Sequence, residues 1–333
     1  MDTLIYVIIA TLILLYVIDK KEPIPPNPVT PIKGEGEVVE ISRGSETNEE
    51  KRQEIYKDIF KSIKEINPLK TYRVWTYIEI PNESRNVQLS YQQMGVPIYF
   101  QKCIDLMKKN VPELVILTPI NINKYLPDFN IDMKHTSEIP LKLRIDILFT
   151  TILENYGGLC ISPGTIIYDI NRALSMLKSY EIVTFGGSPS VLQAHNNLYY
   201  PNSYVLGSQE KSSFIQEYKR LLLLVVRNTY RYDLNVLDNS DILAKLINEL
   251  RPSQFHFGTE YDGSYNSKLE KIPLSTYMGT HSIDFQNKER ISLITIPYDT
   301  LLKTRKYQWF LNLSEEQFMQ SNLELKNLLQ NDI

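Results

Sequence analysis

The sequence predicts an α/β protein with a mainly parallel sheet flanked by helices. Helix-type and strand-type segments alternate from residue 48 onward, which is typical of a parallel sheet covered by helices. Leu114–Thr118 (LVILT) is a continuous apolar run of strand length, as expected of a strand buried on both faces. The chain is 43% hydrophobic and 23% charged, which is ordinary for a globular protein.

The N-terminus predicts a membrane anchor over residues 1–20. Thr3–Ile18 is uncharged and strongly apolar, and its length is at the short end of the roughly 17–25 residues that span a bilayer. A cleaved signal peptide is one alternative to an anchor, but it would begin with positive charge, and here Asp2 precedes the apolar run. A buried core helix is the other alternative. Lys20 and Lys21 follow the apolar run, and positive charge after the span predicts that the globular part lies on the cytosolic side. If the globular part were lumenal instead, the sequons at Asn82 and Asn312 would be open to glycosylation.

Residues 21–48 are expected to form a stem, and residues 49–333 a single globular domain. Five prolines between Pro23 and Pro31 favour an extended chain, and the Gly-, Glu- and Ser-rich stretch after them cannot bury a core. From Asn48 onward, N-cap chemistry and apolar periodicity indicate a first helix that ends before Asn67-Pro68.

Within the globular part we expect the following elements, in chain order. Strands are predicted at Tyr72–Ile80, Leu114–Thr118, Leu159–Ile161, Glu181–Phe185, Tyr199–Leu206 and Arg290–Ile296. Helices are predicted at Pro97–Lys109, before Tyr156, and at Arg172–Ser179, Gln209–Arg227, Ser240–Leu250 and Ser314–Leu329. Ser314 and Gln317 fit a capping box at the start of the last helix.

Charge and cysteine usage exclude two classes of function. A net charge of −3 and a pI near 5.9 give no basic footprint, so no nucleic-acid partner is expected. The four histidines and two cysteines are not spaced along the chain as zinc ligands are, so no zinc site is expected. Because Cys103 and Cys160 both lie in apolar segments, we expect buried free thiols. Abundant Tyr, Ile, Asn and Lys suit an AT-rich genome, as in large viruses or some bacteria.

The stretch Ile139–Ile170 is the centre of the predicted fold. Gly157 and Gly158 follow Tyr156, and they let the chain turn tightly into the strand Leu159–Ile161. Ser162-Pro163-Gly164 comes directly after that strand, and strand ends are where α/β enzymes usually hold their chemistry. Asp146 lies in an apolar neighbourhood, so its carboxylate must pair or stay solvated.

Several of these features occur together in the order of one family. They are Val74-Trp75, Pro97, Cys103-Ile104, Val115–Thr118, Asp146–Leu148, Tyr156–Leu159 and Asn202–Tyr204. In this order they resemble the capsular-polysaccharide-synthesis glycosyltransferases and their relatives in glycosyltransferase family 32. The resemblance implies a GT-A-like fold and a nucleotide-sugar donor. It also implies donor-binding roles for Trp75, Asp146, Tyr156, Gly157 and Gly158.

The chain departs from the family where the family binds a metal. Its Asp-x-Asp supplies oxygen ligands for Mn²⁺ or Mg²⁺, but here those positions are Ser162 and Gly164. The family's Ser and Arg positions around Asp146 are Ile145 and Phe149. We therefore expect neither Mn²⁺ nor Mg²⁺, nor any other cofactor, and no catalytic residue is assigned. Cations that could replace the metal are Lys142, His256 and His281, none of them in a diagnostic spacing.

Three functional hypotheses remain open. The first is a membrane-anchored glycosyltransferase-like protein without metal-dependent activity. The second is an active, metal-independent enzyme that moves a sugar from a nucleotide-sugar donor to a glycan or protein acceptor. The third is a structural scaffold with protein partners, in a virion or its membrane, that uses the same fold. An unrelated α/β fold with a chance Tyr-Gly-Gly is the remaining alternative.

Overall fold

The computed structural model describes residues 72–79, 96–129, 139–187, 200–228, 239–251, 253–258, 262–268 and 270–330. All of them belong to the compact unit Glu46–Ile333. The predicted anchor (1–20), the stem (21–48) and the first predicted helix lie outside the described residues. Within the described residues, no helix is both long enough and apolar enough to cross a bilayer.

The core of the fold is a six-stranded sheet in the order β2-β1-β3-β6-β5-β7. Its strands are β1 (Val74–Tyr77), β2 (Leu114–Leu117), β3 (Gly158–Ile161), β5 (Ile182–Gly187), β6 (Tyr200–Ser208) and β7 (Phe255–Phe257). β1 pairs in parallel with both β2 and β3, and β5 pairs in parallel with β7. Within this described sheet only β6 is antiparallel to its neighbours. The expectation of a mainly parallel sheet is therefore confirmed.

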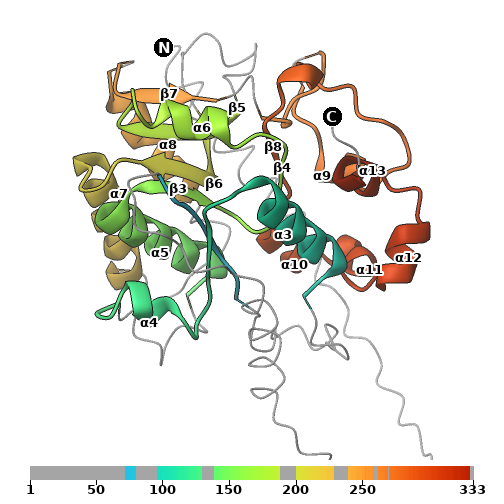
Figure 1. The fold of residues 1–333 in the computed structure, drawn as a ribbon, viewed down its shortest axis with the longest axis horizontal. Coiled ribbons are helices and arrows are strands. Elements are labelled where there is room, and N and C mark those ends of the chain that lie inside the picture. Colours follow the sequence, from blue (N-terminus) through green and yellow to red (C-terminus); the bar gives the residue numbers. More distant parts are fainter. Residues whose placement is uncertain are drawn as a thin grey trace, which may run out of the picture. The chain divides into compact units, whose positions relative to one another are not determined.

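Helices cover both faces of this sheet (Figure 1). The longer ones are α3 (Ile98–Asn110), α5 (Leu141–Tyr156), α7 (Ser213–Asn228) and α8 (Asn239–Glu249). The short ones are α4 (Ile122–Tyr125), α6 (Asn171–Met176), α9 (Leu274–Tyr277), α10 (Tyr298–Lys303), α11 (Gln308–Leu311), α12 (Glu315–Gln320) and α13 (Glu324–Gln330), with 3-10 turns η3 (Lys288–Arg290) and η4 (Arg305–Tyr307). The predicted helices that correspond to α3, α5, α7 and α8 agree with these bounds to within a few residues. α3 and α5 each begin directly after a proline, whose fixed φ suits the start of a helix.

Successive side chains of the central strands pack into two separate hydrophobic cores, one on each face of the sheet. Val74 and Ile116 pack with α3 and the C-terminal helices, whereas Trp75, Val115 and Cys160 pack with α5, α7 and α8. Because side chains alternate across a strand, the continuous apolar runs are buried on both sides. The sheet is thus the middle layer between two helical layers, as the LVILT run indicates.

A second, two-stranded sheet continues directly from the central strand. β4 (Thr165–Ile167) pairs antiparallel with β8 (Leu293–Thr295). The sequence predicts the second of these strands but not β4, because its partner lies more than a hundred residues away and the stretch before β4 reads as a loop. This pairing fixes the path of the chain just after Ser162-Pro163-Gly164.

The predicted single helix Ser314–Leu329 is wrong. The structure has two helices, α12 and α13, separated at Ser321, whose backbone is extended (φ −70, ψ 156). The Ser321 hydroxyl donates to the Phe318 carbonyl at 2.6 Å, which is the kind of local bond by which serine competes with a continuing helix. The capping box of Ser314 and Gln317 at the start of α12 is confirmed.

Both cysteines are free and buried, as the sequence predicts. Burial raises the pKa of the Cys103 and Cys160 thiols, so they remain protonated and behave as apolar core groups.

Candidate functional site

The glycine turn between α5 and β3 is required by its surroundings. Gly157 and Gly158 have φ values of 62° and 101°, a region that favours glycine. A Cβ on Gly158 would lie 2.2 Å from the Arg73 carbonyl oxygen, and one on Gly157 would lie 2.7 Å from the Glu210 nitrogen. The turn therefore lets β3 lie tightly against the start of β1.

Trp75 and Tyr156 pack together at this turn. The Trp75 indole donates to the Gly157 carbonyl at 3.0 Å, and its ring centroid lies 5.4 Å from that of Tyr156. The Tyr156 hydroxyl donates to the Tyr125 carbonyl at 2.6 Å. Four of the five residues with predicted donor-binding roles, Trp75, Tyr156, Gly157 and Gly158, thus gather where β3 begins. None of them lines the pocket described next, which lies where β3 ends, and their role in donor binding stays a prediction.

The backbone after β3 is packed tightly against two other strands. The Ser162 amide donates to the Tyr204 carbonyl at 2.7 Å, and the Ile296 amide donates to the Gly164 carbonyl at 2.9 Å. A Cβ on Gly164 would lie only 2.5 Å from the Ile296 carbonyl oxygen. An aspartate at Gly164 could therefore not be accommodated without moving β8.

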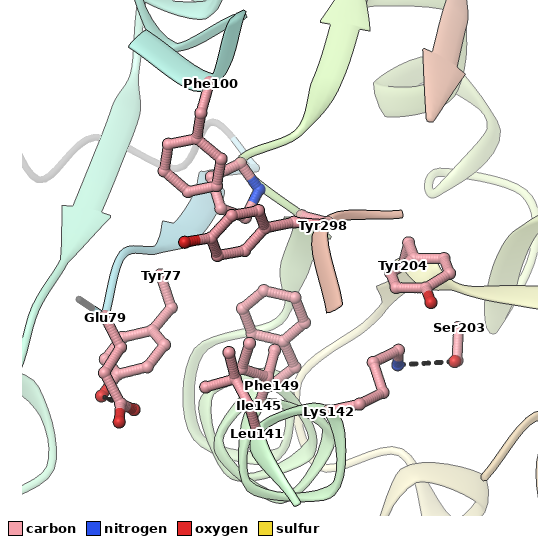
Figure 2. A pocket seen from close by; sticks show the side chains of 12 residues that line it. Tyr77, Glu79, Phe100, Leu141, Lys142, Ile145, Phe149, Ser203, Tyr204 and Tyr298 are labelled. Atoms are coloured by element: carbon pink, nitrogen blue, oxygen red, sulfur yellow. Dashed lines mark hydrogen bonds between the residues drawn. The ribbon is translucent and has the colours of Figure 1, made fainter. Parts of the chain in front are cut away.

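A pocket of about 430 Å³, including its open mouth, lies beside this segment. The pocket is lined by residues from β1 and its end, α3, α5, the segment after β3, β6 and α10 (Figure 2), namely Tyr77, Glu79, Phe100, Leu141, Lys142, Ile145, Phe149, Ser162, Pro163, Ser203, Tyr204 and Tyr298. The positions that replace the family's Ser, Arg and first Asp, which are Ile145, Phe149 and Ser162, all lie in its wall.

Lys142 is the cation in the wall of this pocket, and it is held by three protein groups. Its ammonium group forms an ion pair with Asp146, one turn further along α5. It also donates to the Ser203 hydroxyl at 2.6 Å and lies 4.7 Å from the centroid of the Tyr204 ring. The Asp146 side chain is only 2% exposed, so the pairing expected of this carboxylate is provided by Lys142.

A second ion pair lies across the pocket. Arg144 donates to Glu79 Oε1 at 2.5 Å, and the Tyr77 hydroxyl donates to Glu79 Oε2 at 3.0 Å. Arg144 also donates to the Ile139 carbonyl at 3.2 Å, which ties it to the start of α5. Glu79 therefore brings a carboxylate to the wall that is already balanced by a neighbouring cation.

Aromatic rings form much of the remaining wall. The Phe100 and Tyr298 rings pack with centroids 4.8 Å apart, and in Figure 2 they face Phe149 and Ile145 of α5 across the pocket. Together with Tyr77 and Tyr204, these rings come from five different elements. No local pattern in the sequence connects Tyr298 with Phe149, so the sequence could not predict this wall.

The other two cations considered from the sequence lie elsewhere. His256 is part of β7, where it pairs with Val183, and its ring packs 5.4 Å from that of Tyr180. His281 is exposed. Of the three, only Lys142 lies in the pocket. The signal that could have singled it out is its spacing of four residues from Asp146 on one helix.

The groups beside β3 do not fit a divalent cation. Mn²⁺ and Mg²⁺ prefer carboxylate and other hard oxygen ligands, but Ser162 offers a neutral hydroxyl and Gly164 no side chain. Glu79, which lines the pocket, and Asp146, which pairs with the lining residue Lys142, are each paired with a cation. In the part of the chain that the structure describes, no three His, Cys, Asp or Glu side chains are grouped as metal ligands.

Comparisons with known proteins place the chain near no single family. No protein-family model matches the sequence, and no curated protein matches it either.

Several solved glycosyltransferases show a distant structural similarity. One is involved in glycosylation of the major capsid of PBCV-1, with 11% identity, a TM-score of 0.37, and coverage of 72% of this chain and 98% of that one. GlyE of Streptococcus pneumoniae TIGR4 in its apo form has 10% identity and a TM-score of 0.37, covering 78% of this chain and 62% of GlyE. Mouse xyloside xylosyltransferase 1, in its apo form, has 10% identity and a TM-score of 0.35, and the match covers 69% of this chain and 98% of the mouse enzyme's chain. These values are too low to establish a shared fold or function.

Proposed function

We propose that this protein is glycosyltransferase-like, with a GT-A-like fold, and lacks metal-dependent transfer activity. The ordered sequence features around Tyr156-Gly157-Gly158 support the family. The mainly parallel sheet and the pocket at the end of β3 are consistent with a ligand site on such a scaffold.

The observation that supports loss of the metal most strongly is the packing at Gly164. The family's second aspartate would have to occupy a position where even a Cβ lies 2.5 Å from the Ile296 carbonyl. The family's first aspartate is replaced by Ser162, which is 7% exposed. Ser162 and Gly164 supply neither of the carboxylates that the resembled family has, and the packing at Gly164 leaves no space for the second one.

An assay of the full-length chain tests this proposal. Hydrolysis and transfer are measured over a panel of nucleotide-sugars, each with and without Mn²⁺. We expect no turnover that Mn²⁺ stimulates, because no ionised oxygen is available at Ser162 or Gly164 to bind it. Turnover that rises with Mn²⁺ and is abolished by a chelator would overturn the proposal.

A metal-independent transferase is the second candidate, and the position of Lys142 favours it. A fixed cation can stabilise charge that develops on a departing phosphate, and Lys142 lies in the pocket with Ser162. This candidate predicts metal-free turnover that Lys142→Met abolishes under conditions where thermal unfolding shows the variant to be still folded. The exposed Lys245 of α8 offers the matched control, and Lys245→Met should leave turnover unchanged. Absence of any turnover without metal rejects this candidate.

We also propose that residues 1–20 anchor the protein in a membrane, with the globular domain on the cytosolic side. The apolar run Thr3–Ile18 and the following Lys20-Lys21 support this. Protease treatment of sealed membranes tests it, since a cytosolic domain would be digested without detergent. A protected or glycosylated domain would reverse the orientation, and release of the chain by alkaline washing would reject the anchor.

A further inference from the structure

The 3-10 turn η4 and the helix α11, which follows it directly, have an inner and an outer face. The inner face packs into the core through buried side chains, namely Tyr307, Phe310 and Leu311. The outer face carries Arg305, Lys306 and Trp309, which are all exposed. Trp309 comes four residues after Arg305 and three after Lys306 along continuous helical backbone, so the three side chains are neighbours.

Trp309 leaves half of a large indole in contact with solvent. Its exposed fraction of 51% is the highest among the large apolar side chains that the structure describes, whereas the adjacent Phe310 is 1% exposed. An indole has an apolar ring and one polar N–H, and it therefore favours a boundary where one side is apolar and the other wet. The ring contributes little to the core in this position and is available for contact with another surface.

The two cations beside Trp309 are not used by the fold. The ion pairs that the structure describes involve other basic residues, and neither Arg305 nor Lys306 takes part in one. The Lys306 ammonium lies 4.8 Å from the centroid of the Tyr307 ring, a contact that leaves its charge uncompensated. Both cations are thus available to an anionic surface.

The acidic residues that follow in the chain do not cancel this charge. Between residues 305 and 320 they are Glu315 and Glu316. Glu315 is paired with Lys102 of α3 at 2.6 Å. Glu316 remains as one carboxylate against two free cations, and it accepts a bond from Gln320 at 3.1 Å within α12.

We infer that Arg305, Lys306 and Trp309 form a face that docks the globular domain on an anionic lipid bilayer. The indole lies at the level of the lipid headgroups, as interfacial tryptophans do, and the two cations contact lipid phosphates and carboxylates. The inference rests on the proposed anchor at residues 1–20. It goes beyond that anchor by assigning the face of the domain that meets the membrane.

The proposed anchor makes a bilayer the expected partner of this face. The compact unit begins at Glu46, so about 25 residues separate it from the anchor, and such a chain spans at most about 90 Å when fully extended. Tethering over that distance turns docking into an intramolecular step, for which a small contact area suffices. The cytosolic leaflet, which the domain is proposed to face, is the anionic one.

Tryptophan fluorescence of the full-length chain in lipid vesicles tests the inference. The chain has two tryptophans, and Trp75 is 0% exposed, so a quencher in the bilayer can reach only Trp309. The vesicles contain phosphatidylcholine alone or mixed with phosphatidylserine, each with and without brominated acyl chains. We expect bromolipid quenching and protection from aqueous iodide in the phosphatidylserine vesicles, and both should weaken at high salt because the charges are exposed.

Variants assign the effect to this face. Arg305→Gln/Lys306→Gln keeps the reporter and should lower the ratio of docked to undocked domain about 25-fold, at about fivefold for each cation. Lys178→Gln/Lys245→Gln is the matched control, since it removes the same charge from two exposed lysines elsewhere, and should change nothing. Trp309→Phe should remove the bromolipid quenching. Thermal unfolding confirms that each variant is folded.

Two results would overturn the inference: Trp309 stays accessible to iodide in phosphatidylserine vesicles, or Arg305→Gln/Lys306→Gln is quenched as strongly as the original chain. The first would be the outcome if an acidic protein surface were the partner of this face. Failure of the anchor is read separately, as release of the chain by alkaline washing, and phosphatidylserine-dependent quenching that survives such a finding would uphold the docking face.

Discussion

Lys142 and Asp146 form an ion pair across one turn of α5, and both are largely withdrawn from water, with side chains 14% and 2% exposed. In the resembled family the corresponding aspartate helps to hold a nucleotide-sugar, whereas here its charge is compensated by a residue of its own helix. The carboxylate that the resemblance assigns to the donor is thus paired within α5, and it does not line the pocket.

Breaking this pair should destabilise the fold. Lys142→Met leaves the Asp146 carboxylate buried without its cation, and loss of one partner of a buried pair costs about 3–5 kcal/mol. The double variant Lys142→Met/Asp146→Leu should recover much of that free energy of unfolding, because no charge remains buried. Urea unfolding measures both; a single variant as stable as the original chain would show that Asp146 does not depend on Lys142.

Gly164 should tolerate no side chain. Gly164→Ala places a methyl group 2.5 Å from the Ile296 carbonyl oxygen, and overpacking of this kind costs about 1–3 kcal/mol. Gly279→Ala is the matched control, since its Cβ would lie 3.2 Å from the nearest oxygen and should cost less. Equal unfolding free energies for the two variants would show that β8 yields easily at Gly164, and would remove the main support for a lost metal site.

Trp75 should contribute to stability and leave ligand affinity unchanged. Trp75→Phe removes the indole bond to the Gly157 carbonyl and leaves that acceptor without its described donor, at a cost of about 1–3 kcal/mol. Because Trp75 does not line the pocket, the dissociation constant of any ligand that binds there should stay the same. A weaker affinity at unchanged stability would instead support the donor-binding role that the resemblance implies.

Asp262 predicts a pH dependence of stability. Its carboxyl accepts a bond from the Ser264 hydroxyl at 2.6 Å, and burial raises its pKa from 3.8 to about 6. Because the folded state binds this proton more tightly than the unfolded chain does, the protonated Asp262 carboxyl adds to the free energy of unfolding. This stabilisation is complete below pH 4 and is lost as the pH rises through 6. A difference of about 2 pKa units corresponds to about 3 kcal/mol.

Asp262→Asn should therefore flatten stability between pH 4 and pH 7 and raise the unfolding temperature near neutrality. Thermal unfolding across that pH range measures the effect. The exposed Asp241 of α8 supplies the control, because Asp241→Asn alters no group packed around Asp262. An Asp262→Asn profile with the same slope as the original chain would contradict the raised pKa.

The sequence predicts the parts of this fold whose signals are local. Apolar runs such as Leu114–Leu117 mark buried strands, and the periodicity before Tyr156 marks α5. It does not predict β4, whose partner β8 is remote, nor the break at Ser321, where a short hydroxyl side chain interrupts an apolar pattern that continues on both sides.

The sequence predicts where the candidate site lies, but not which side chains form its wall. The segment Ser162-Pro163-Gly164 after β3 does lie at the pocket, as a strand end in an α/β fold suggests. Lys142 could have been paired with Asp146 from their spacing alone. Glu79, Phe100 and Tyr298 reach the same pocket from three separate elements, and only the packing of the sheet against α3, α5 and α10 brings them together.

The central claim, a site that functions without a divalent metal, is tested most directly by titrating Mn²⁺ into the full-length chain in the presence and absence of UDP. The account predicts no heat beyond that of Mn²⁺ binding to UDP in protein-free buffer, because Ser162 and Gly164 provide no ionised ligand and Asp146 is paired with Lys142. Saturable Mn²⁺ binding in excess of that protein-free titration would contradict it.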